Sequence, residues 1–164
     1  MTDTPRFDLP PKAPPEIVDA RQALAERVCR ELRLVGFPVS RRDLTGDRNV
    51  LPGVDVHVTP FVDGGVYANW HTDAELSGPA LDLFAQGIDY ANPPPAVRHF
   101  HTVLNQMQAA LMGILASAGF EVEEPDGHGH GSMVLVTGFQ PRSARPDPTR
   151  PGPTQETRRS ELTT

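Results

Sequence analysis

The chain has 164 residues, a length that usually forms one domain. Five of its 18 prolines lie in residues 1–15 and five more in residues 141–153. Because such ends bury little apolar surface, we expect them to be disordered. The predicted boundaries are disordered segments at 1–14 and 139–164 and one domain at 15–138. The net charge is −6. The C-terminal segment contributes +2 and the N-terminal segment zero, so the domain carries −8. Because acidic surfaces repel phosphate backbones, this charge argues against a protein that reads nucleic acid.

The first predicted element is a helix over residues 15–35. Apolar residues recur there every three or four positions, Pro15 suits the first turn, and Gly36 suits the end. A short strand at about residues 37–41 should follow, and then a polar loop that runs as far as Pro52.

Residues 54–72 predict a β-hairpin. Apolar and polar residues alternate on both sides of Asp63-Gly64-Gly65, which has the composition of a three-residue hairpin loop. That loop sets three apolar cross-strand pairs: Val62 with Val66, Pro60 with Ala68, and Val58 with Trp70. One face of the hairpin is then wholly apolar, and a shift of one residue would mix the two faces, so burial should select this pairing.

The opposite face of this hairpin carries our candidate binding surface. In the predicted register His57 lies opposite His71, and Phe61 lies opposite Tyr67. The surface consists of five residues: His57, Phe61, Tyr67, Asn69 and His71. An aromatic pair among polar residues marks either packing under a loop or a recognition patch for a ligand or partner, and both interpretations stay open at this point.

Two further helices are expected after the hairpin. Thr72 followed by Glu75 resembles a capping box ahead of a short helix at about residues 79–86. A long helix over residues 95–118 is indicated by a continuous apolar stripe that ends at Gly119.

Strands at about residues 120–124 and 132–137 complete the predicted elements. Together the elements predict an α+β fold of the two-layer sandwich type. In that fold an antiparallel sheet of four or five strands carries the two long helices, 15–35 and 95–118, on one face.

Histidines form two clusters that could ligate a divalent metal such as zinc. The predicted pairing brings His57 and His71 to about 5 Å, and Asp55 or Asp73 could add a carboxylate. A His-x-His step occupies the Gly-rich turn 125–131. The metal site would use four histidines: His57, His71, His128 and His130. The plainer interpretations, a solvated sheet face and a polar turn, stay open beside it.

Several protein classes lack their sequence signals here. The single cysteine, Cys29, forbids an intrachain disulfide and a cysteine-based zinc cage. No Gly-x-Ser-x-Gly elbow, phosphate-binding glycine loop or His-Glu-x-x-His helix occurs, which favours a non-catalytic protein. No secretory leader opens the chain, and its longest apolar run, residues 109–118, is too short to span a bilayer, so we expect a cytoplasmic protein without a membrane anchor.

Some sequence words around the long helix resemble uncharacterised small proteins of high-GC actinobacteria. They are Ala96-Val97-Arg98-His99 and Leu115-Ala116-Ser117-Ala118-Gly119-Phe120, with Trp70-His71-Thr72 before them. The resemblance covers about residues 20–136 and implies no activity, cofactor or site residue.

The sequence therefore favours a non-catalytic binding or interaction module that acts on a protein partner, a second copy of itself or a small ligand. The alternative is a small metal-binding protein or metal-dependent enzyme that uses the clustered histidines.

Overall fold

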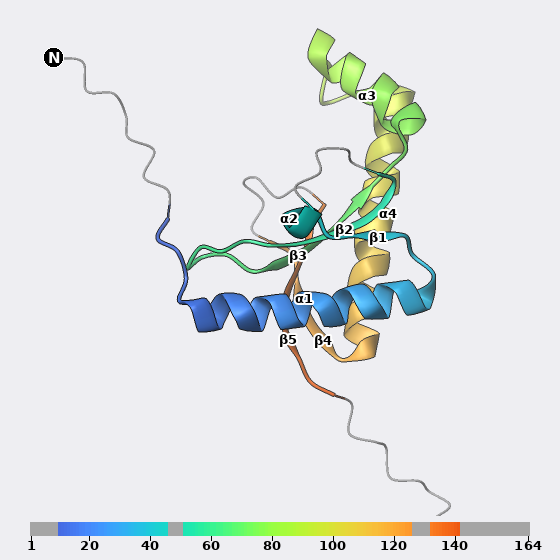
Figure 1. The fold of residues 1–164 in the computed structure, drawn as a ribbon. Coiled ribbons are helices and arrows are strands. Elements are labelled where there is room, and N and C mark those ends of the chain that lie inside the picture. Colours follow the sequence, from blue (N-terminus) through green and yellow to red (C-terminus); the bar gives the residue numbers. More distant parts are fainter. Residues whose placement is uncertain (1–9, 46–50, 126–131, 142–164) are drawn as a thin grey trace, which may run out of the picture.

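The computed structural model describes residues 10–45, 51–125 and 132–141 (Figure 1). Most of the two segments expected to be disordered, 1–14 and 139–164, lies outside these ranges. The elements in chain order are α1 (Pro15–Val35), β1 (Val39–Ser40), α2 (Arg42–Thr45), β2 (Gly53–Val58), β3 (Val66–His71), α3 (Ala74–Gln86), α4 (Pro95–Ala118), β4 (Phe120–Glu123) and β5 (Val134–Phe139).

The described strands form one sheet in the order β1-β2-β3-β5-β4. The α+β prediction with helices packed on a sheet is confirmed, but the sheet is mixed instead of antiparallel. The strands β2, β3, β5 and β4 pair antiparallel, whereas β1 runs parallel to β2. A parallel pair needs a crossover connection, and the described residues that follow β1 in it include α2.

The two long helices begin and end in the same way, which explains why their bounds follow from sequence. Each has a proline at its first position, Pro15 or Pro95, where the missing N–H costs no helical hydrogen bond. Each ends at a glycine with a φ of 100°, Gly36 or Gly119, a left-handed conformation that favours glycine.

One apolar core lies between these helices and one face of the sheet. The most deeply buried side chains come from α1, α4 and the central strands: Val28, Leu32, Leu111, Leu115, Val54, Val56, Val66, Val134 and Val136. The predicted apolar face of the hairpin is confirmed for the residues within β2 and β3, whereas Pro60 and Val62, which lie beyond β2, are exposed. Trp70 is half-buried and packs against this core, with its ring edge-on to Phe37 at a centroid distance of 5.9 Å.

The predicted hairpin register is wrong by four residues. Val58, not Val62, lies opposite Val66, and the connection covers residues 59–65 instead of three residues. An even shift leaves every side chain on its predicted face, so the alternating pattern alone could not distinguish the two registers.

Contacts with the N-terminal segment explain this register. The amide of Ala13 donates to the carbonyl of Pro60, and that of Val62 donates to the carbonyl of Pro11. Arg21 of α1 also donates from Nη1 to the carbonyls of Thr59 and Phe61. Pro60 itself has no N–H to donate to β3.

The helix α3 begins earlier than predicted, at Ala74 instead of residue 79, and contains Pro79. Its N-cap is Asp73, whose Oδ1 accepts a hydrogen bond from the Glu75 amide at 2.8 Å, so the predicted capping role of Thr72 is wrong by one residue. Figure 1 shows α3 beside the N-terminal half of α4, where both extend past the sheet. We call α3, residues 87–94 and residues 95–107 of α4 the helical arm.

Candidate functional site

A buried carboxylate, Asp55, organises the sheet face opposite the core. Asp55 lies on β2 and is 3% exposed. Its Oδ2 accepts a hydrogen bond from Arg42 Nη2 at 2.6 Å, and its Oδ1 accepts one from the Arg42 amide at 3.3 Å. The same Oδ2 lies 3.3 Å from His57 Nδ1 and 4.0 Å from His71 Nε2. One carboxylate thus contacts one guanidinium and two imidazoles.

The two histidines face Asp55 without forming regular hydrogen bonds to it. His57 Nδ1 and His71 Nε2 are both buried, and neither atom has a hydrogen-bond partner within the described part of the chain. Burial opposes ionisation of Asp55, but the contacts with His57 and Arg42 outweigh it and hold the pKa of this carboxyl below its usual value. Burial, aided by the charge of Arg42, lowers the pKa of His71 despite the nearby carboxylate. His71 is therefore a neutral imidazole at neutral pH.

The structure rearranges the predicted binding surface. The predicted partners His57 and His71 are not opposite each other, because His57 lies opposite Tyr67 and His71 opposite Gly53. The rings of His57 and Tyr67 stack at a centroid distance of 5.5 Å. Asn69 lies opposite Asp55.

The predicted pairing of Phe61 with Tyr67 is also wrong. Phe61 lies beyond β2 and forms an isolated bridge with Lys12. Tyr67 is 6% exposed, so its side chain is packed, as the first of the two interpretations expects. The five predicted surface residues therefore do not form one exposed patch.

The predicted metal site receives no support from the residues that can be described. In the ranges 10–45, 51–125 and 132–141 no group of three or more histidine, cysteine or acidic side chains is arranged to hold a metal ion. His128 and His130 lie outside the described residues. Near His57 and His71 the available carboxylate, Asp55, already contacts the Arg42 guanidinium, whose positive charge opposes a cation at the same oxygen.

A cavity of about 360 Å³ opens where β3 leaves the sheet. Pairing between β3 and β5 ends at Ala68 with Val134, so the last three residues of β3 have a described strand partner on the β2 side only. Residues of the helical arm line the other side of this gap. The lining residues come from β3, α3, α4 and the start of the β5 segment: Asn69, Trp70, His71, Thr72, Ala74, Ser77, Leu81, Phe100, Leu104 and Ser132.

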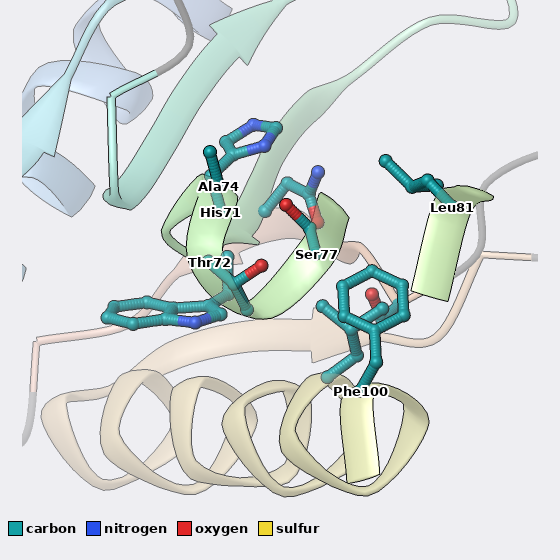
Figure 2. A pocket seen from close by; sticks show the side chains of 10 residues that line it. His71, Thr72, Ala74, Ser77, Leu81 and Phe100 are labelled. Atoms are coloured by element: carbon teal, nitrogen blue, oxygen red, sulfur yellow. The ribbon is translucent and has the colours of Figure 1, made fainter. Parts of the chain in front are cut away.

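Figure 2 shows how the cavity is divided between apolar and polar groups. Phe100 points from α4 toward the part of α3 that carries Ser77 and Leu81. His71 and Thr72, from the end of β3 and the turn after it, lie on the other side of the cavity. The polar groups are three hydroxyls, one amide, one imidazole and the indole N–H of Trp70, and no lining residue carries a formal charge when His71 is neutral.

His71 connects the cavity to the buried carboxylate. It lines the cavity, and its Nε2 lies 4.0 Å from Asp55 Oδ2. Sequence reasoning selected His71 and Asn69, but it assigned Trp70 to the core alone and placed Phe100 and Leu104 only in a helix stripe. It also passed over Arg42, which follows β1 in a segment interpreted as a polar loop. No local signal links Arg42 to Asp55, which is 13 positions away.

The fold and site together define a small α+β protein with an uncharged cavity between a mixed sheet and a helical arm. No protein-family model, curated protein or solved structure matches the chain. Within the described ranges, every helix is too short or too polar to cross a bilayer.

Proposed function

We propose that this protein is a non-catalytic binding module that holds a small uncharged molecule in the cavity between β3 and the helical arm. The observation that carries the proposal is the cavity itself, which combines apolar walls with a few hydrogen-bonding groups and has no charged lining residue. Its volume of about 360 Å³ falls at the lower end of the range for small-molecule sites.

The apolar walls favour a ligand with a flat apolar body. Trp70 and Phe100 offer aromatic surfaces, and Leu81 and Leu104 offer aliphatic ones. Transfer of an apolar ligand surface from water to such walls stabilises the complex in proportion to the area buried. Aromatic side chains also favour stacked or edge-on contacts with a ring of the ligand.

The polar groups favour a ligand that donates or accepts a few hydrogen bonds. Asn69, Ser77 and Ser132 line the cavity with an amide and two hydroxyls. A charged ligand group would lose its hydration without meeting an opposite charge there, and that loss is costly. The carboxylate beside His71, Asp55, does not compensate a cation because it is already paired with Arg42.

The proposal does not include a divalent metal at His57 and His71. Arg42 lies against the carboxylate that such a metal would need, and the two histidines alone underdetermine a metal site.

A matched pair of fluorescent probes tests the proposal. N-phenyl-1-naphthylamine is uncharged, and 8-anilinonaphthalene-1-sulfonate has the same aromatic body with a sulfonate added. We expect saturable binding of one uncharged probe per chain and at least about tenfold weaker binding of the sulfonate, because one desolvated charge costs well over 1.4 kcal/mol.

Two variants locate the bound probe. Leu104→Trp adds bulk to the cavity wall and should weaken binding of the uncharged probe at least tenfold. Leu34→Trp adds the same indole on the outside of α1, where Leu34 is 77% exposed, and should leave binding unchanged. If neither probe saturates, or if Leu104→Trp binds as the native chain does, the cavity is not a binding site. Equal binding of both probes would refute only the preference for an uncharged ligand.

A further inference from the structure

The helical arm leaves part of its apolar surface uncovered. The apolar stripe of α4 packs on the sheet from Leu111 onward, but the same stripe continues through the arm, where no described residue belongs to the core cluster. Four side chains of this continuation are half-buried: Phe100, Val103, Leu104 and Met107. Leu81 of α3 is 55% exposed, and Tyr90 in the connection is 79% exposed.

The helix α3 covers the N-terminal half of α4 only in part. Ala80 is the one fully buried residue of α3, and Val97 is the one fully buried residue of α4 within the arm, as far as the described residues go. Helices of this length are marginal in water and owe their stability mainly to packing of an apolar face. The exposed apolar surface therefore marks a face that fits a further protein surface.

Charge on the arm is separated by helix. The helix α3 has acidic residues and no basic ones, and Glu75 and Asp82 are both exposed. Over its 24 residues α4 has one formally charged side chain, Arg98, which is exposed and close in sequence to the exposed His99. No ion pair joins α3 to α4 within the part of the chain described.

The helix α1 provides an internal comparison. It packs on the same face of the sheet as α4, but its 21 residues include eight formal charges of both signs, as expected for a helix whose outer side faces water. The single charge of α4 is therefore not a general property of the outer helices in this chain. The low charge of α4, and not exposed apolar area alone, distinguishes it from α1, which also exposes Ile17, Leu34 and Val35.

We infer that the arm pairs with the arm of a second copy of this chain around a two-fold axis, with α3 of each copy against the N-terminal half of α4 of the other. A two-fold interface brings one surface patch against its own copy, so the patch must be complementary to itself. An acidic helix beside a helix whose only formal charge is positive meets this requirement, because each finds its opposite on the partner copy. The exposed apolar side chains of the arm would form the centre of the interface and the charges its rim.

This inference goes beyond the proposed ligand binding and can fail independently of it. Glu75, Asp82 and Arg98 do not line the cavity. Their substitution should change the assembly state and leave binding of the uncharged probe within about twofold of the native value.

The test uses two charge-reversed chains and their mixture, followed by analytical ultracentrifugation. One chain carries Glu75→Lys with Asp82→Lys, and the other carries Arg98→Glu. The native chain should sediment as a dimer, and each reversed chain alone should show a dimer Kd raised at least about tenfold, because like charges then face each other. An equimolar mixture should dimerise again, because each reversed helix then meets its complement.

The matched control is Arg30→Glu, which reverses one exposed charge on α1 and should leave the dimer intact. Far-ultraviolet circular dichroism and probe binding verify that each variant is folded. A native chain that stays monomeric at every concentration would overturn the inference. A mixture no more dimeric than its two components would also overturn it, as would equal dissociation by the control.

Discussion

Replacing Asp55 by Asn tests whether the buried carboxylate stabilises the fold through its charge. The substitution keeps the size of the side chain but removes the charge that faces Arg42 and His57. Hydrogen bonds to a charged group contribute about 1.5–3 kcal/mol each, and an Asn amide retains part of that contribution. The Arg42 side chain is 40% exposed and can regain water, which lessens the loss. We therefore expect the free energy of unfolding to fall by about 2 kcal/mol.

Urea denaturation followed by circular dichroism measures this loss, and its pH dependence identifies the cause. The pKa of Asp55 lies below the ordinary value of 3.8, so its stabilisation is fully present above pH 3.8 and is lost as the pH falls through the lower folded-state pKa. The loss caused by Asp55→Asn should therefore be present at pH 5 and above, and the native chain and the variant should converge in stronger acid.

The matched control is Asp63→Asn at an exposed loop position, which should change the free energy of unfolding by less than about 0.5 kcal/mol. The reasoning would be refuted by a loss at Asp55 no larger than at Asp63. It would also be refuted if Asp55→Asn cost as much in an Arg42→Gln background as in the native chain, because contacting residues should be coupled.

Three other outcomes follow from the structure. Burial lowers the pKa of His71 below 6.5, so on acidification the unfolded chain takes up a proton at this residue before the folded chain does. The contribution of His71 to stability should therefore be full above pH 6.5 and decline below it. In urea denaturation, His71→Gln should make the free energy of unfolding depend less on pH below 6.5. Gly53→Ala should cost about 2 kcal/mol or more in the same assay, because Gly53 has a φ of +132° and a Cβ there would lie 2.6 Å from the carbonyl oxygen of Pro38. Gly113→Ala should instead stabilise α4 by up to about 1 kcal/mol, because a Cβ at Gly113 meets nothing within 4 Å; a loss of stability there would contradict the described helix surface.

The helices could be predicted closely because their limits are set locally. A proline at the first position and a left-handed glycine at the end act within one turn of the chain, so Pro15 to Gly36 and Pro95 to Gly119 delimit α1 and α4 without reference to the rest of the fold. The alternating valines likewise determined which face of the hairpin is buried, because side chains alternate along any strand.

The hairpin register and the site could not be predicted because they depend on contacts between distant segments. The pairing of residues 59–62 is decided by the N-terminal segment and Arg21, about 40 positions away. The pairing of Asp55 with Arg42 depends on the crossover that places α2 beside β2. The cavity depends on how the arm leaves the sheet, which no short sequence pattern determines.

The bridging of residues 60–62 to Pro11 and Ala13 has a consequence for how this protein is handled and altered. Two registers of the hairpin, four residues apart, bury the same faces of its strands. The N-terminal residues that pair with residues 60–62 favour the register with fewer paired residues. Removing these N-terminal residues would allow the hairpin to adopt the longer register, in which Val62 lies opposite Val66. His57 would then lie opposite His71 instead of Tyr67. Truncation at the N-terminus would thus change the cross-strand partners of two histidines that are distant in sequence.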